Sequence, residues 1–250
     1  MRRYVIAVSV CVGLAFSASA FAQTVPGGGD KWIISTYTPA NGYTTPVPMP
    51  VTKIKAGGVS FDLFINGGSP DRAMLITDKQ FPAGKLTGKS LSARIAIIAT
   101  PDTTFNYCGD NCDGTDLGGF VRLYIQGVNP ALEGCQSGWH PERPDCEAQY
   151  WWSNPIAIDL AALALLGKNG TTLQEVLSPA FWSDRDGHRG DTPVFTDPDS
   201  GITVDHAAAF QAAVKNATKM GLSFGGGNNF AFGTGASQSA QFLLYDFTIK

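Results

Sequence analysis

Four segments of the chain alternate between apolar and polar residues with a period of two. They are residues 58–65, 91–99, 120–128 and 241–249. In a β-strand successive side chains point to opposite faces, so this alternation is typical of a strand with one face against a core. Within 120–128 the apolar face is formed by Val121, Leu123 and Ile125, and the polar face by Arg122, Tyr124 and Gln126. The pattern therefore predicts four half-buried strands.

Shorter runs of β-branched and aromatic residues predict further strands at residues 31–38, 73–78, 148–154, 222–224 and 230–232. The elements do not alternate as strand, helix, strand, and neither an internal repeat nor a linker divides the chain after residue 31. Many short strands with long connections favour sheets that pack face to face. We expect a mainly β protein, an antiparallel β-sandwich of the jelly-roll type, with residues 31–250 as a single domain.

Two short helical insertions interrupt this β pattern. The sequence Thr172-Leu-Gln-Glu175 matches a capping box and predicts a helix over residues 172–177. Asp205 can cap a second helix, in which apolar residues recur at helical spacing as far as Met220 and Gly221 ends the helix.

Residues 148–154 place three aromatic side chains in a row. In a strand, Tyr150 and Trp152 share one face, while Trp151 and Ser153 share the other. Two interpretations remain open. One indole faces outward and offers a rigid stacking surface, or the sheet is covered on both faces and both indoles belong to the core.

The N-terminus has the three parts of a secretory signal peptide. Met1-Arg2-Arg3 is basic, an apolar run follows to Phe16, and Ala20-Phe21-Ala22 is a small-residue cleavage site. We expect residues 1–22 to be removed, residues 23–30 to form a flexible leader, and the protein to be secreted or periplasmic. The apolar run is too short to cross a bilayer and no later segment is long enough, so no membrane span is expected.

The charge balance limits the partners. The formal net charge is −3, and loss of Arg2 and Arg3 with the signal makes the remaining chain more acidic. Nucleic acids and anionic lipids call for basic patches, so neither is an expected partner. The low share of charged residues, 16%, together with 29 glycines and 15 prolines, suits an extracellular β fold rich in loops.

Four cysteines follow the signal peptide: Cys108, Cys112, Cys135 and Cys146. An even number of cysteines in an exported protein predicts disulfides, for which three pairings are possible. Proximity in the sequence favours Cys108 with Cys112 and Cys135 with Cys146. The rival is a zinc site, although the spacing is not that of two Cys-x-x-Cys knuckles.

The strand patterns also carry a family resemblance. Residues 120–124 (Phe-Val-Arg-Leu-Tyr), 150–154 (Tyr-Trp-Trp-Ser-Asn) and 242–247 (Phe-Leu-Leu-Tyr-Asp-Phe), with Trp182-Ser183 and the glycine-rich segment 221–227, resemble exported bacterial jelly-roll domains of the carbohydrate-binding or galactose-binding-like type. The resemblance covers roughly residues 90–250, and the cysteine-bearing loop 100–119 departs from it. It implies a non-catalytic module that contacts a glycan.

A sugar site needs a flat aromatic ring against the C–H face of the sugar and planar polar groups for its hydroxyls. The expected ligand-binding residues are Arg122, Tyr124, Gln126, Trp151 or Trp152, and Trp182. The alternatives are a surface salt bridge for Arg122 and a core position for Trp182.

Two acidic clusters could hold calcium, which prefers oxygen ligands on a glycine-bent loop. The first offers Asp184, Asp186 and Asp191, and the second lies in residues 110–116. Neither has the spacing of an EF-hand, and two arginines in the first could neutralise its acids. The alternative for both is a solvated turn.

Signals for catalysis are weak. The acids near the aromatic stretch, Glu133, Glu142, Glu147 and Asp159, do not lie on the polar face of residues 120–126. A Ser-His-Asp arrangement could draw only on His140, His188 or His206, and no Gly-x-Ser-x-Gly elbow is present. The sequence thus favours a secreted, non-catalytic glycan-binding domain. The alternatives are a glycoside-active hydrolase or lyase and an extracellular structural protein.

Overall fold

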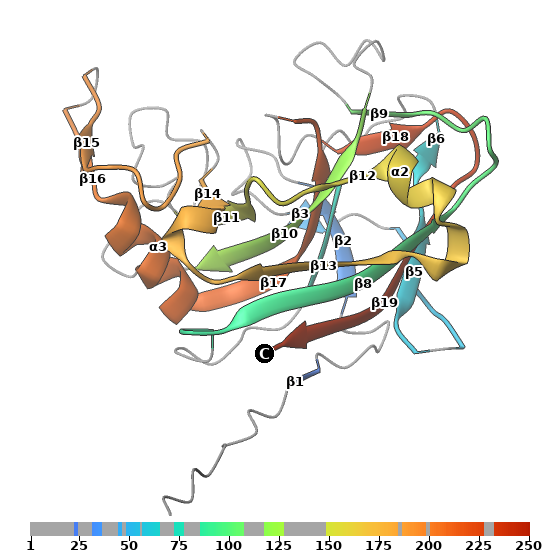
Figure 1. Ribbon diagram of the computed structural model, residues 1–250, viewed down its shortest axis with the longest axis horizontal. Helices are drawn as coiled ribbons and strands as arrows, with labels where there is room; N and C mark the ends of the chain where they lie inside the picture. Colours follow the sequence, from blue (N-terminus) through green and yellow to red (C-terminus); the bar gives the residue numbers. More distant parts are fainter. Residues whose placement is uncertain are drawn as a thin grey trace, which may run out of the picture.

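The computed structural model describes residues 23–24, 32–36, 45–46, 49–55, 57–65, 73–77, 86–107, 118–127, 149–184, 187–198, 201–227 and 233–250. These residues form two main sheets, two small sheets and two short α-helices (Figure 1). The mainly β fold class expected from the alternation is confirmed.

The first main sheet is antiparallel. Its strands run in the order β13 (Thr171–Val176), β8 (Ser90–Ile98), β19 (Gln241–Ile249), β5 (Val59–Asp62) and β4 (Thr52–Lys53). A sixth strand, β1 (Gln23–Thr24), pairs with β19. Gln23 and Thr24 therefore belong to the sheet rather than to a flexible leader, and residues 25–30 lie outside the described part of the chain.

The second main sheet is also antiparallel. Its order is β14 (Trp182–Ser183), β11 (Tyr150–Ser153), β10 (Phe120–Gly127), β17 (Ala217–Gly225), β7 (Ala73–Thr77), β2 (Trp32–Thr36) and β3 (Thr45–Pro46), and β12 (Ile158–Asp159) also pairs with β10. One small sheet joins β15 (Phe195–Thr196) to β16 (Thr203–Val204). The other holds β6 (Phe64–Ile65), β18 (Thr234–Ala236) and β9 (Phe105–Tyr107), and its β18–β6 pairing is parallel.

The core lies between the two main sheets. Phe61 and Phe242 of the first sheet both contact Phe224 of the second, with ring centroids 5.5 and 4.9 Å apart. Trp32 meets Phe247 across the same interior, at 5.4 Å. Edge-to-face contacts of this kind add to the free energy gained by burying the rings. The alternating apolar positions therefore form a sandwich core, as expected.

The helices differ from the expectation. The predicted helix at 172–177 is wrong, because residues 171–176 form β13, with Leu173 opposite Ala93 of β8. In this segment Leu173 and Glu175 are buried while their neighbours are exposed. The period of two and the free edge of β8 outweigh the local capping pattern, since tertiary pairing overrides propensity.

One helix was missed, and one is shorter than predicted. Helix α2 (Leu160–Leu165) begins at the cap Asp159, and α3 (His206–Lys215) begins at the predicted cap Asp205. Helix α3 ends before the predicted Gly221, because the chain continues as β17 from Ala217. Gly127 lets α3 approach β10, since a Cβ there would lie 2.3 Å from the Cα of Ala213. The two helices lie at opposite ends of the molecule in Figure 1.

Candidate metal centre

The residues predicted to bind a sugar share a strand pair but not an exposed surface. Tyr124 lies opposite Trp152 and Gln126 opposite Tyr150, so these four side chains and that of Arg122 are on one face of the sheet. Tyr124 and Trp152 are 0% exposed, and Arg122 is 4% exposed. The expected exposed face is therefore corrected to a buried one. Their assignment as ligand-binding residues stays a prediction.

The other two tryptophans belong to the sandwich core. Trp151 packs edge-to-face on Phe210 of α3 at 5.1 Å, and Trp182 lies 6.2 Å from the same ring. The indole N–H of Trp182 donates to the carbonyl of Val176 at 2.7 Å. Trp182 therefore lies in the core, which is the alternative that the sequence left open for it.

Arg122 holds a turn of its own chain. Its two terminal nitrogens donate to the carbonyls of Gly226 and Gly227, each at 2.9 Å. Burial lowers the pKa of this guanidinium to about 10, so it remains charged at neutral pH. Arg122 is therefore buried rather than at the surface, and it clamps a glycine turn.

The two described members of the predicted calcium site, Asp184 and Asp191, have different partners. The carboxylate of Asp191 is exposed and accepts two hydrogen bonds from Arg189, at 2.9 and 2.6 Å. Asp184 is buried and its partners are histidines, while Asp186 lies outside the described residues. The second acidic cluster, at 110–116, and the cysteines Cys108, Cys112, Cys135 and Cys146 also lie outside them. Among the described residues, Asp184 is grouped with two histidines and not with Asp191, and the calcium site stays a prediction.

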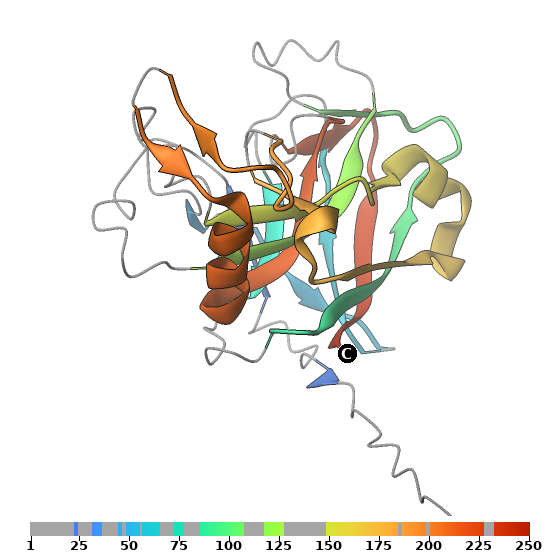
Figure 2. The same ribbon diagram turned by 60° about the vertical axis from the view of Figure 1, so that its left-hand side comes forward.

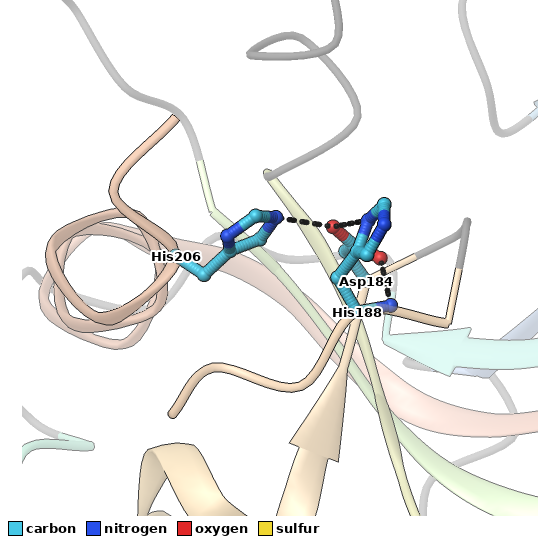
Figure 3. Close-up of side chains that lie close together, drawn as sticks. All are labelled: Asp184, His188 and His206. Carbon is cyan, nitrogen blue, oxygen red and sulfur yellow. Dashed lines mark hydrogen bonds and ion pairs between the residues drawn. The ribbon is translucent and has the colours of Figure 1, made fainter. Parts of the chain in front are cut away.

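A different group forms around Asp184. Its Oδ2 atom is 3.5 Å from Nδ1 of His188 and 3.4 Å from Nε2 of His206. The ligand atoms of the three side chains all lie within 4.8 Å of one another, and the two imidazole centroids are 5.0 Å apart. Figure 3 shows both rings directed at the same carboxylate. This group could hold a metal ion.

Separate elements position the three residues. Asp184 directly follows β14, and a turn brings the chain back so that the Asp184 N–H donates to the carbonyl of His188 at 2.9 Å. The His188 N–H in return donates to Oδ1 of Asp184, also at 2.9 Å. His206 is the first residue of α3, which Phe210 anchors against the tryptophans. The group therefore joins the end of a sheet to the start of a helix.

Burial and the neighbouring histidines shift the pKa of Asp184 in opposite directions. Burial alone would raise its pKa, but hydrogen bonds and the charges of His188 and His206 outweigh burial, and the pKa lies below its ordinary value. The carboxylate is thus ionised at neutral pH. The start of α3 lies beside it, and the positive end of a helix dipole favours a negative charge. His206 is itself buried, and its Nδ1 has no hydrogen-bond partner among the described residues.

The types of donor atom narrow the choice of metal ions that would fit this group. Two imidazole nitrogens and one carboxylate oxygen suit zinc, copper, nickel or iron, whereas calcium takes six to eight oxygens. Without a metal, the same contacts form a hydrogen-bonded His-Asp-His group. The sequence held a partial signal: Asp184 and His188 are four residues apart around Gly187, and His206 directly follows the predicted helix cap. The fold supplies the contact between these two segments.

The acids considered for glycoside hydrolysis do not form a pair in the described residues. Asp159 caps α2 by accepting from the N–H of Ala162 at 2.8 Å. Glu133, Glu142 and Glu147 lie outside the described residues. Among the helices that the structure describes, none is both long and apolar enough to span a bilayer.

Comparisons with known proteins concern the fold alone. A solved xylan-binding module, CBM15, is similar over 91% of this chain and 94% of that chain, with a TM-score of 0.41 and 11% sequence identity. A second solved structure belongs to work on endo-acting O-glycanases of the human gut microbiota that initiate mucin breakdown. It covers 92% of this chain and 95% of its own, with a TM-score of 0.37 and 10% identity. No protein-family model matches the sequence, and no curated protein matches it.

Proposed function

We propose that this protein is an exported β-sandwich that binds a divalent transition-metal ion between Asp184, His188 and His206. The observation that carries the proposal is the convergence of two imidazoles on one buried carboxylate oxygen, at 3.5 and 3.4 Å. Ligands about 2.0–2.2 Å from a tetrahedral zinc ion lie roughly this far from each other. A small adjustment of side chains would therefore admit the ion.

The ion is zinc or a neighbouring late first-row metal rather than calcium. Imidazole favours these ions, and their affinity for nitrogen and oxygen donors rises towards copper. One carboxylate together with two imidazoles is also a ligand set that these ions commonly have. The described Asp184 group has too few oxygen atoms for a calcium site.

The direct test is calorimetric titration of residues 23–250 after chelation and dialysis. We expect one equivalent of Zn²⁺ to bind at this site, and Ca²⁺ to give no signal there. Asp184→Asn removes the shared carboxylate and should weaken zinc binding by about tenfold or more, since even supporting residues of metal sites matter on this scale.

Asp191→Asn is the matched control for this titration. Asp191 is an aspartate of the same turn region, but it pairs with Arg189 at the surface. The control should bind zinc as the wild type does. Equal binding by wild type and both variants would place the metal elsewhere, and preferential binding of Ca²⁺ would contradict the choice of ion.

The second candidate function is contact with a polysaccharide. It is favoured by the register of β10 and β11, which places a guanidinium, two phenols, an amide and an indole on one face of the sheet: Arg122, Tyr124, Tyr150, Gln126 and Trp152. Gln126 is the least buried member of this set. These are the groups that sugar recognition uses.

A glycan array with the purified protein tests this second candidate. We expect a hit that Gln126→Ala weakens and Gln241→Ala does not, because Gln241 is a half-buried glutamine of the other main sheet. If no glycan binds, with or without zinc, this candidate is removed and the metal proposal is unaffected.

A further inference from the structure

We infer that the metal centre keeps a coordination position for an external anionic oxygen ligand, on the side of His188 and Phe195. This inference rests on the proposed metal function and adds to it the class of ligand that the ion would take. An open coordination position distinguishes a metal ion that binds a second molecule from one that only stabilises the fold.

The number of protein donors is the first argument. Among the described histidines and acids, the group has three members, and each offers one ligand atom. Structural zinc sites are closed by four protein ligands, whereas sites that act on other molecules have three and leave a position for water or substrate. Three donors from two segments therefore match the open kind of site.

The accessibility of the three side chains is the second argument. Those of Asp184 and His206 are 4% and 2% exposed, whereas that of His188 is 40% exposed. An ion held between them is closed off on the aspartate side and reachable past His188. Phe195 stacks on the His188 ring, with centroids 5.7 Å apart and planes at 28°, and it is 37% exposed. An external ligand would thus enter beside an aromatic ring.

Charge and surface character define the class of ligand. A divalent ion with one carboxylate and two neutral imidazoles carries a net charge of about +1, which favours an anionic oxygen donor. Phe195, which stacks on His188 and is 37% exposed, gives the site an apolar border. The ligand that fits both features is a small carboxylate-like or hydroxamate-like anion with an apolar body.

Cobalt substitution gives a test with a visible signal. Residues 23–250 are loaded with Co²⁺, whose absorption spectrum depends on its coordination, and are titrated with acetohydroxamate and then with benzohydroxamate. Gel filtration afterwards verifies that Co²⁺ has stayed on the protein. We expect a saturable spectral change with both probes, and binding of benzohydroxamate several-fold tighter than that of acetohydroxamate.

Two phenylalanine variants test the apolar border. Phe195→Ala should reduce the preference for benzohydroxamate to about none while the response to acetohydroxamate remains. Phe181→Ala is the matched control, because Phe181 is a similarly exposed ring, at 40%, that has no described contact with the Asp184 group. Loss of the preference in both variants, or in neither, would overturn the role of Phe195.

The outcomes also separate this inference from the proposed function. If Co²⁺ does not bind, or binds equally well to Asp184→Asn, the proposed metal function fails and the inference fails with it. If Co²⁺ binds at Asp184 but its spectrum does not respond to either probe, the function stands and the inference is overturned. If the spectrum responds to the probes only in the Asp186→Asn variant, Asp186 occupies the fourth coordination position in the wild type. That result would also overturn the inference.

Discussion

At the scale of single residues, Arg122 shows how a charged side chain can be buried on the outer face of a sheet. Its alternation with Val121 and Leu123 suggests a solvent-facing position. In the structure the guanidinium is instead buried and bonded to the carbonyls of Gly226 and Gly227. Arginine suits this role, because its planar fork of donors can satisfy two carbonyls at once and stays charged when buried.

Replacing Arg122 by methionine tests whether the clamp outweighs the cost of burying its charge. We expect Arg122→Met to lower the free energy of unfolding by about 1–3 kcal/mol, because two carbonyls lose charge-assisted hydrogen bonds. Urea denaturation measures the change. Arg94→Met is the control, since Arg94 is an exposed arginine that covers the Tyr245 ring, and it should change stability by less than about 1 kcal/mol. A more stable Arg122→Met would show that desolvation dominates instead.

The aspartates near residue 190 make a second point at this scale. By sequence, Asp184 and Asp191 are equivalent candidates for a metal site. The structure buries Asp184 between two imidazoles and leaves Asp191 at the surface with Arg189. Asp184 directly follows β14, whereas Asp191 lies in a turn beyond the bridge between Ser183 and Arg189.

At the scale of elements, both helices begin at an aspartate N-cap, but the two caps have different consequences. The Asp159 carboxylate accepts from the N–H of Ala162 at 2.8 Å, and that of Asp205 accepts from the N–H of Ala208 at 3.0 Å. Each cap satisfies a backbone donor that the first turn leaves without a helical partner. Only the second helix also carries a member of the metal group, His206.

The two caps give a matched pair of variants. Asp205→Ala and Asp159→Ala should each lower the free energy of unfolding by about 1 kcal/mol, because each loses one capping hydrogen bond. Only Asp205→Ala should also weaken zinc binding, since fraying of α3 displaces His206. Urea denaturation and zinc titration of both variants check this. Equal zinc affinities would mean that the packing of Phe210, rather than the cap, positions His206.

At the scale of the whole molecule, the two ends of the described chain meet in one sheet. Gln23 lies opposite Ile249 and Thr24 opposite Thr248, as the pairing of β1 with β19 requires (Figure 2 gives a second view of this end of the molecule). The predicted signal cleavage after Ala22 would leave Gln23 as the first residue. Cleavage would therefore retain β1 and its hydrogen bonds to the last strand.

Export of the full-length chain in a bacterial host tests this arrangement. We expect the intact mass of the exported protein to match residues 23–250, and Ala20→Leu together with Ala22→Leu to block processing, because signal cleavage requires small residues at these positions. Retention of residues 1–22 in the wild-type exported protein would contradict the predicted signal. A cut beyond Thr24 would remove β1 from the sheet.

The sequence by itself determined the β class, most of the longer strands and the cap of α3. These features follow from local regularities: alternation with a period of two, and a short polar side chain before an apolar helical run. Only the tertiary structure decided that residues 171–176 are a strand, that the row around Tyr124 and Trp152 is buried, and that His206 meets Asp184. Each of these depends on which segments lie beside one another. A local pattern shows that a residue can face a partner, but the packing of distant segments determines which partner it has and whether water reaches it.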